Sequence, residues 1–500
     1  MPTSRRIVEW ALASALGAVT VLGYAPFHLH PLPLLTFAGL FLLWQRAPDA
    51  RASALLGFLF GLGWFLAGVS WVYISLHVFG AMPQALAAAV TLLFCAYLAL
   101  HPALAGYLSR RYALPPALNW ILFVPGTFTL LEWLRGWLFT GFPWLNPGYT
   151  QAPESPLAGF APLLGLHGIT LLLFAGAGAL SLLWPLKPWS RLRTLWPWPA
   201  AVVALWIAGA GLKSMTWTEP TGSRLAVSLL QGNIAQDLKW REDHLRATLA
   251  AYQSLVTGSA SRLVILPETA LPIFLRDVPA DYLETLAEHM RLNKGDVLVG
   301  VPERLPGGSY YNSVISLGTA ERQTYRKSHL VPFGEFIPLR PLLGALVSML
   351  AIPLQDFARG GIDQQPLRVA GEQVAVNICY EDAFGEEIIR QLPQATLLVN
   401  VSNVAWFGRS IAPQQHLQIA QMRALETGRY MLRATNTGMT AVVNPAGRVE
   451  AVAPEFTQSV LTHTVSGMRG ATPYVRWGNI PALVLCVAGI ALAIFLSRRR

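Results

Sequence analysis

The chain has few charged residues. Only 13 % of its 500 residues are Asp, Glu, Lys or Arg, whereas 53 % are hydrophobic, and its mean hydropathy is positive. Soluble domains carry about 25 % charged residues. This deficit excludes an ordinary soluble protein and indicates that parts of the chain cross a membrane.

Cysteine is also scarce, with three residues in the whole chain. Cys95 and Cys486 lie inside apolar runs, where a thiol usually acts as a small hydrophobic side chain. Cys379 stands alone in the polar part of the chain, so it has no nearby partner for a disulfide. The sequence contains no Cys-x-x-Cys or Cys/His cluster, and we therefore expect no metal site.

Acidic residues are in deficit overall, and the net charge is +10. A basic balance raises the possibility of nucleic-acid binding. However, positive and negative charges nearly balance between Trp217 and Tyr474, and the excess lies in the loops and tails of the hydrophobic part. We therefore expect no nucleic-acid partner.

Long apolar runs predict membrane helices, since a bilayer core needs roughly 20 apolar residues per helix. We expect seven spans within residues 1–212 and one more in residues 479–500, which end in a basic tail. The eight candidates are Ile7–Ala25, Leu32–Trp44, Leu55–Leu76, Ala85–Tyr107, Asn119–Leu138, Phe160–Trp184, Trp198–Leu212 and Ile480–Leu496.

Positive charge marks every second connection between these spans. The basic groups are Arg5/Arg6, Arg46/Arg51, Arg110/Arg111, Lys187/Arg191/Arg193 and Arg498–Arg500. Cytoplasmic loops of membrane proteins carry such an excess of Lys and Arg. The pattern therefore predicts that both termini are cytoplasmic and that residues 213–478 lie outside the cytoplasm.

The segment 213–478 has the length of one globular domain and alternates strand-like with helix-like runs. Expected strands are Leu225–Gln231, Leu263–Leu266, Val297–Val301, Ser313–Leu317, Val374–Ile378, Leu397–Val401, Ala441–Asn444 and Val460–Thr464. Expected helices are Trp240–Val256, Ala280–Leu292, Gly385–Leu392 and Pro413–Gly428. This layout predicts an α/β domain with a mixed sheet.

Three motifs place a reactive side chain just after a strand, which is where α/β folds present their sites. Leu-Val-Ile-Leu-Pro-Glu-Thr-Ala contains Glu268, and Tyr-Arg-Lys-Ser-His-Leu-Val-Pro-Phe-Gly-Glu-Phe contains Lys327 and Glu335. Val-Ala-Val-Asn-Ile-Cys-Tyr-Glu-Asp contains Cys379 and Glu381. Taken singly, these residues also suit a turn, a solvated charge or a buried thiol.

Together the three motifs supply the parts of a covalent mechanism. The nucleophile is a thiolate, and a free thiol is mostly protonated at neutral pH. The carboxylate of Glu268 can accept the thiol proton as a general base. The ammonium of Lys327 can stabilise an oxyanion. Cys379 thus becomes a nucleophile without a metal or cofactor.

The order Glu268, Lys327, Cys379, spaced 59 and 52 residues apart, resembles the nitrilase superfamily, whose α-β-β-α sandwich carries a Glu-Lys-Cys triad. Fusion to membrane spans resembles the apolipoprotein N-acyltransferase family in particular. The most specific matching segments are His-Leu-Val-Pro-Phe-Gly-Glu-Phe at 329–336, Ile-Cys-Tyr-Glu at 378–381, Ala-Trp-Phe-Gly at 405–408, Gly-Phe-Pro-Trp-Leu at 141–145 and Gln-Gly-Asn-Ile at 231–234. The chain departs from the family's Ser-Asn-Asp pattern, because it has Val404 in the third position.

The resemblance implies an acyltransferase of the bacterial inner membrane, with its catalytic domain on the periplasmic side. A fatty acyl chain would pass from a phospholipid, typically phosphatidylethanolamine, to Cys379 as a thioester. It would then pass to the α-amino group of the S-diacylglyceryl cysteine that begins an apolipoprotein. By the same resemblance, Glu335 and Glu381 support the triad, unless they form only a structural ion pair.

Further residues are expected to shape the site. Asn312 would fix it by hydrogen bonding, and Tyr380 follows the nucleophile directly. Aromatic side chains would line the entrance for acyl chain or headgroup, although core packing explains an aromatic equally well; they are Trp240, Phe333, Trp406 and Tyr380. Trp144, in an outer loop of the membrane part, would close the floor of that cavity.

Two alternatives remain open from the sequence. A membrane-anchored amidase would use water as the second nucleophile on a small C–N substrate. A transporter with a ligand-binding domain is a different class, but the spans lack the broken helices and midplane charges of a transport site.

Overall fold

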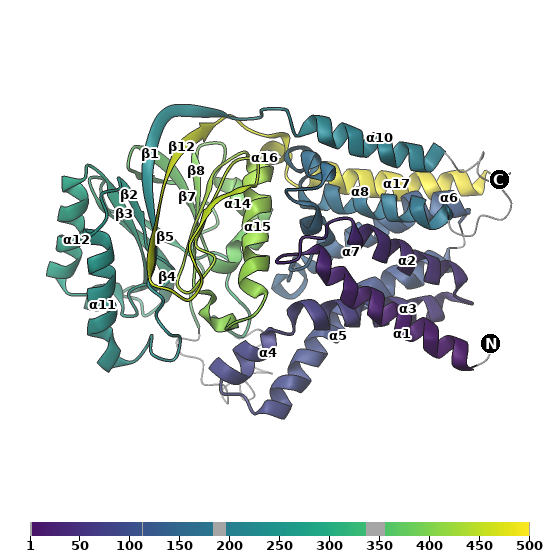
Figure 1. The fold of residues 1–500 in the computed structure, drawn as a ribbon, viewed down its shortest axis with the longest axis horizontal. Coiled ribbons are helices and arrows are strands. Elements are labelled where there is room, and N and C mark those ends of the chain that lie inside the picture. Colours follow the sequence, from purple (N-terminus) through teal and green to yellow (C-terminus); the bar gives the residue numbers. More distant parts are fainter. Residues whose placement is uncertain (1–2, 113, 184–196, 337–355, 500) are drawn as a thin grey trace. The chain divides into compact units, whose positions relative to one another are not determined.

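The computed structural model describes residues 3–112, 114–183, 197–336 and 356–499. The chain divides into two compact units (Figure 1). The first comprises residues 1–73, 85–215 and 476–500, and the second comprises residues 74–84 and 216–475.

The first unit is helical. Its main helices are α1 (Thr3–Thr20), α2 (Leu32–Arg46), α3 (Ala50–Val69), α5 (Gln84–Arg111), α7 (Val124–Arg135), α8 (Ala161–Leu183), α10 (Pro197–Leu212) and α17 (Ile480–Arg498). Among the described residues, six helical stretches are long and apolar enough to cross a membrane, and α2 and α10 are shorter apolar helices. The basic cluster Lys187–Arg193 lies outside the described residues.

The third expected span ends earlier than the sequence indicates. The sequence predicts that it reaches Leu76, but α3 ends at Val69. The indole N–H of Trp71 donates to the carbonyl of Gly68 at 3.0 Å, which satisfies one of the carbonyls left free at a helix end. The chain then continues through the short α4 (Val72–Ile74) and the π-helical η2 (Ser75–Phe79), and residues 74–84 group with the second unit.

A buried ion pair organises one loop of the first unit. The side chains of Arg135 and Glu132 are both fully buried, and Nη2 of Arg135 lies 2.5 Å from Oε2 of Glu132. Arg135 also donates to the carbonyls of Phe142 and Trp144. Because a buried guanidinium must find acceptors for its five N–H groups, these contacts fix the segment that carries Trp144.

The second unit contains two six-stranded sheets. The first has the order β12-β1-β2-β3-β4-β5 and the second the order β11-β10-β9-β8-β7-β6. The strands of the first sheet are β1 (Glu219–Gln231), β2 (Leu263–Ile265), β3 (Asp296–Arg304), β4 (Tyr310–Gly318), β5 (Thr324–Arg326) and β12 (Ser459–Arg469). Those of the second are β6 (Leu367–Val369), β7 (Glu372–Ile378), β8 (Leu397–Ser402), β9 (Met431–Thr435), β10 (Ala441–Val443) and β11 (Val449–Val452).

Alternating side chains bury both faces of each sheet. Leu263 and Ile265 of β2 join a core shared with β7 and β8, while Val264 joins a second core under helices α11 (Glu242–Thr257) and α12 (Ala280–Leu292). On the second sheet, Leu398 packs in a third core with α15 (Ala412–Thr427). The unit is therefore a helix-sheet-sheet-helix sandwich (Figure 1), the layering that the nitrilase resemblance implies.

All eight expected strands are present, and the structure adds β5, β6, β9 and β11. Two of these added strands have only three residues, too few for an alternating pattern to stand out. One expected helix is wrong in extent, because α14 covers only Gly385–Ile388 and a 3₁₀ turn follows it.

Candidate active site

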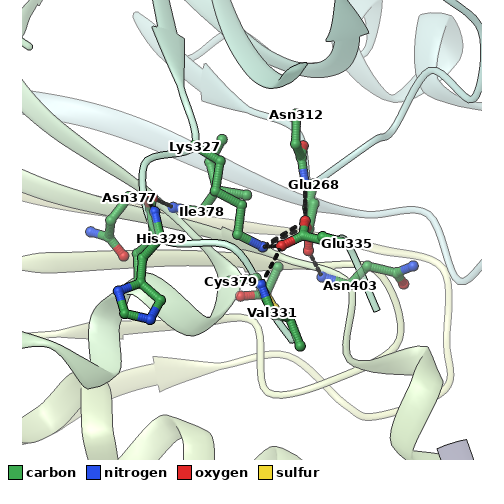
Figure 2. Close-up of polar contacts among 12 residues, drawn as sticks. Glu268, Asn312, Lys327, His329, Val331, Glu335, Asn377, Ile378, Cys379 and Asn403 are labelled. Atoms are coloured by element: carbon green, nitrogen blue, oxygen red, sulfur yellow. Dashed lines mark hydrogen bonds and ion pairs between the residues drawn. The ribbon is translucent and has the colours of Figure 1, made fainter. Parts of the chain in front are cut away.

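Three strands deliver the three residues singled out in the sequence. Glu268 lies three residues after β2, and Lys327 and Cys379 directly follow β5 and β7. The first two strands belong to one sheet and β7 belongs to the other. Figure 2 shows the Cys379 side chain beside the ammonium of Lys327 and the carboxylate of Glu268.

Glu268 is buried, and each of its carboxylate oxygens has a partner. Asn312 donates from Nδ2 to Oε1 at 2.7 Å, and the backbone N–H of Asn403 donates to Oε2 at 2.8 Å. Lys327 Nζ lies 3.6 Å from Oε1. These contacts fix the orientation of the carboxylate (Figure 2).

Glu335 is the closer partner of Lys327. Lys327 Nζ donates to Glu335 Oε1 at 2.9 Å, and Glu335 Oε2 accepts from the backbone N–H of Val331 at 2.8 Å. Asn312 Nδ2 also donates to Glu335 Oε1, at 3.2 Å. One amide group thus bridges both carboxylates that face the lysine.

The pKa shifts describe the resting charge state of this cluster. Burial acts to raise the pKa of Glu268, but the ammonium groups of Lys327 and Lys239 outweigh it, and the pKa is lowered. Burial acts against the charge of Lys327, but Glu335 and Glu268 outweigh it and raise its pKa. Both groups are therefore ionised at neutral pH.

Cys379 begins the short helix η9 (Cys379–Ala383) in a left-handed backbone conformation, with φ of 55°. This conformation is uncommon for a residue with a side chain, and it turns the thiol out of the line of β7. Burial and the negative charge of Glu268 raise the pKa of Cys379, with Lys327 acting in the opposite direction. The resting site therefore pairs a neutral thiol with an ionised carboxylate that can receive its proton.

Glu381 acts on the backbone around the site. Its Oε1 accepts from the N–H groups of Ser328 at 2.6 Å and His329 at 3.0 Å. Its Oε2 accepts from the N–H of Ile378 at 2.7 Å and the hydroxyl of Tyr325 at 3.0 Å. Burial raises the pKa of this carboxyl to about 7. One side chain thereby ties the segment after Lys327 to the strand that ends at Cys379.

The aromatic residues expected at the entrance occupy different settings. Tyr380 is nearly buried, with its ring edge-on to Phe384 at 5.1 Å. Phe333 is 43 % exposed, and Trp240 is partly exposed. The ring of Trp406 lies edge-on to Phe79 at 6.0 Å.

Trp144 is buried in the first unit, with its ring 5.2 Å from that of Trp71. Its expected place at the cavity floor stays a prediction.

Comparisons with known proteins cover nearly the whole chain. The family model for the apolipoprotein N-acyltransferase N-terminal domain matches residues 16–179, and the carbon-nitrogen hydrolase model matches residues 226–474. A protein of Nitrosomonas europaea named apolipoprotein N-acyltransferase is 54 % identical, over 98 % of each chain. A protein of the same name from Chromobacterium violaceum is 46 % identical, over 99 % of this chain and 95 % of its own. The chain belongs to the apolipoprotein N-acyltransferase family.

For this family member, the carbon-nitrogen hydrolase region contains every residue of the cluster described above. Motif reasoning nevertheless missed several residues. The backbone N–H of Asn403 contacts Glu268, and the ammonium of Lys239 donates to the backbone carbonyl of Glu268 at 3.1 Å. Neither follows from a local pattern, because both contacts are set by tertiary packing.

A second buried polar cluster lies behind Cys379. Asp382 accepts from His416 at 2.7 Å and from Arg433 at 3.0 Å. Arg433 also donates to Asn400, whose side chain in turn donates to the carbonyl of Cys379 at 2.9 Å. The sequence signal for this cluster was Asp382 itself, two residues after the Cys-Tyr pair.

Within the four described stretches, no group of three or more His, Cys, Asp or Glu side chains is placed to hold a metal ion.

Proposed function

We propose that this protein transfers a fatty acyl chain from a phospholipid to the α-amino group of the S-diacylglyceryl cysteine at the start of an apolipoprotein. The observation that carries the proposal is the cluster of Glu268, Lys327 and Cys379 in a chain that also has membrane-length apolar helices. Relatives named apolipoprotein N-acyltransferase match both parts together, which does not favour a small-amide hydrolase.

In the first step, Cys379 takes the acyl chain. Glu268 accepts the thiol proton while sulfur attacks the carbonyl carbon of the donor ester, and Lys327 stabilises the negative oxygen that forms. When the tetrahedral intermediate collapses, the ester C–O bond breaks. The proton on Glu268 passes to the leaving oxygen, which releases a lysophospholipid and leaves a thioester on Cys379.

In the second step, the lipoprotein amine attacks the thioester carbonyl. The same ammonium stabilises the second oxyanion, and the C–S bond breaks as the amide forms. Glu268 removes a proton from the nitrogen and returns it to sulfur. No net proton or electron is gained or lost over the cycle.

The neighbouring groups support this chemistry through position. Glu335 orients Lys327 at 2.9 Å, and Asn312 holds Glu268 and Glu335 together. Glu381 ties the chain around Cys379 and Lys327. In the proposal, Trp240, Phe333, Tyr380 and Trp406 contact the acyl chain or headgroup, and Trp144 contributes from the membrane part.

The membrane arrangement is part of the proposal. Eight helices cross the bacterial inner membrane: seven in residues 1–212 and one in residues 479–500. Residues 213–478 form the catalytic domain on the periplasmic side, with both termini in the cytoplasm. The phospholipid donor, proposed as phosphatidylethanolamine, then reaches Cys379 from the outer leaflet, so its acyl chains avoid exposure that costs about 0.8 kcal/mol per CH₂.

Intact mass spectrometry of the purified protein mixed with phospholipid alone tests the proposal. We expect one added acyl mass that hydroxylamine removes and that Cys379→Ser abolishes. Cys486→Ser is the matched control and should keep the adduct, because Cys486 lies in α17. Absence of an adduct across several phospholipids, or its persistence in Cys379→Ser, would overturn the proposal.

A further inference from the structure

A second lysine lies against the backbone of Glu268. Lys239 lies in the turn between β1 and α11, and the residue is only 2 % exposed. Lysines are almost never fully buried unless they are paired. Its Nζ donates to the backbone carbonyl of Glu268 at 3.1 Å, so the charge lies directly against the residue that holds the catalytic carboxylate.

Hydrogen bonds fix this turn relative to Glu268. Asn403 donates from its side chain to Gln236 at 2.7 Å and from its backbone to Glu268 Oε2 at 2.8 Å. Gln236 and Lys239 belong to the same turn, in which the N–H of Lys239 donates to the carbonyl of Ala235 at 3.0 Å. Asn403 therefore couples the turn that carries Lys239 to the carboxylate of Glu268.

A second ammonium balances the charge of the two carboxylates around Lys327. Glu268 and Glu335 are two carboxylates that face one ammonium, Lys327. With these three groups alone, the cluster would carry a net negative charge, and a thiolate at Cys379 would add to it. Like charges in a poorly solvated site repel each other strongly. Lys239 brings the cluster to neutrality before the thiolate forms.

We propose that Lys239 is a positioning residue whose ammonium, anchored on the carbonyl of Glu268, offsets the second carboxylate and so stabilises the Cys379 thiolate as it forms. The inference deepens the proposed function, since it rests on Cys379 being the nucleophile. It adds a fourth ionised side chain to the Glu268, Lys327 and Glu335 cluster.

The titration of Lys239 gives the proposal a pH signature. Burial lowers the pKa of Lys239 to about 8, although Glu268 and Cys379 act to raise it. The other charged or titratable groups around the site are Lys327, Glu335 and Glu381, with Asp382, His416 and Arg433 behind Cys379. Lys239 is therefore mostly cationic at pH 7 and loses its charge as the pH rises through about 8.

The test measures alkylation of Cys379 by iodoacetamide, a neutral reagent that reacts with the thiolate. Full-length protein in detergent is sampled from pH 6 to pH 10, and the Cys379 peptide is quantified by mass spectrometry. We expect Lys239→Met to react roughly tenfold more slowly at pH 7, which corresponds to a thiol pKa raised by about one unit. The ratio of the wild-type rate to the Lys239→Met rate should stay constant below pH 8 and fall toward one above it.

Two further variants sharpen the result. Lys239→Arg keeps its charge at every pH, so it should match the wild type below pH 8 and react faster than the wild type above it. Lys294→Met removes an exposed lysine of the same unit and should change nothing. If Lys239→Met does not fold, as judged by its thermal midpoint, the comparison of Lys239→Arg with the wild type decides alone.

The proposal would be overturned if the ratio of the wild-type rate to the Lys239→Met rate equals one, or if it exceeds one but does not change with pH. A merely structural lysine would alter reactivity without a step near pH 8. Alkylation needs neither phospholipid nor lipoprotein. A pH-dependent ratio without any acyl adduct would therefore refute the acyl-transfer proposal alone, and an acyl adduct with a flat ratio would refute only the role of Lys239.

Discussion

At the residue scale, the carboxyl groups around the site each have several partners. Glu381 accepts four hydrogen bonds, and Glu335 contacts Lys327, Asn312 and the backbone of Val331. Such redundancy holds reacting groups in place before substrate arrives, and this preorganisation lowers the cost of reaching the transition state. The loss of one partner should therefore affect catalysis and stability together.

Glu335→Gln tests this expectation. The variant removes the charge 2.9 Å from Lys327 and leaves the ammonium with Glu268 at 3.6 Å. The ammonium of Lys327 should then pair with the carboxylate of Glu268, which is the general base, and hinder it from accepting the thiol proton. We therefore expect acylation of Cys379 to slow by about 100-fold. Breaking one side of a buried pair should also lower the free energy of unfolding by about 3 kcal/mol. Single-turnover acylation and denaturant unfolding measure the two effects.

Glu303→Gln is the matched control, because Glu303 pairs with Arg326, next to Lys327 in the chain. This pair is partly exposed, so its loss should cost less than about 1 kcal/mol. Equal acylation rates in Glu335→Gln and the wild type would contradict an orienting role for Glu335.

The residues that motif reasoning found and those that it missed differ in a physical way. Glu268, Lys327 and Cys379 each follow a short apolar strand, and this local order can be recognised along the chain. Lys239 follows no strand and stands in a polar turn, where a lysine is normally solvated. Its burial depends on Asn403 and Glu268, residues far away in sequence, so no local pattern reveals it.

At the element scale, strand β3 and the turn that carries Glu268 approach each other unusually closely. A Cβ atom at Gly300 would lie 2.2 Å from the carbonyl oxygen of Pro267 and 3.0 Å from the Cα of Glu268. Leu271 donates to the carbonyl of Gly300 at 3.2 Å, which keeps the two segments together. The absence of a side chain at this strand position therefore helps to set where the base lies.

Gly300→Ala should displace the turn around Glu268. The three nearest atoms in the way all belong to the backbone, so none of them can rotate aside. We expect acylation of Cys379 to fall at least tenfold, since small displacements of reacting groups are costly. Overpacking should lower stability by about 1–3 kcal/mol. Acyl-adduct formation over time and thermal unfolding measure both changes.

Gly307→Ala is the control for this substitution. Gly307 lies in the hairpin that follows β3, and a Cβ atom there would meet nothing within 4 Å. Acylation and unfolding should both equal those of the wild type. A Gly300→Ala variant that behaves like Gly307→Ala would show that the close approach does not position the base.

Elements were predictable where hydrophobic patterning was strong. The strands with continuous apolar runs were all recognised, whereas β9 carries the buried polar residues Arg433 and Thr435, which hide its place inside the sheet. The third span was predicted too long, because the apolar run continues past Val69 while a side-chain hydrogen bond from Trp71 accompanies the end of the helix.

At the scale of the whole molecule, the proposed topology makes a prediction about access from the periplasm. Gly307 and Arg51 are both exposed, and the proposal places them on opposite sides of the membrane. In a Cys379→Ser background, Gly307→Cys should react with a membrane-impermeant maleimide in spheroplasts. Arg51→Cys should react only after the membrane is permeabilised. Labelling of both in intact spheroplasts would contradict the topology.

Whole-molecule features were partly accessible from the sequence. The two-part organisation shows in composition, because the apolar runs lie in residues 1–212 and 479–500 and one polar segment lies between them. The number of spans is harder to fix, since α2 and α10 are shorter than the other apolar helices and length alone does not decide whether a helix crosses a bilayer.

The pairing of β1 with β12 has a mechanical consequence. The long segment of the second unit, residues 216–475, has β1 as its first strand and β12 as its last, and these antiparallel neighbours pair from Glu219 with Arg469 inward. Tension that pulled the two connections apart would load the hydrogen bonds of this ladder one at a time from that end. The two strands would therefore separate one hydrogen bond after another, at low force. Tension applied to only one of the two connections would instead be resisted by the whole sheet.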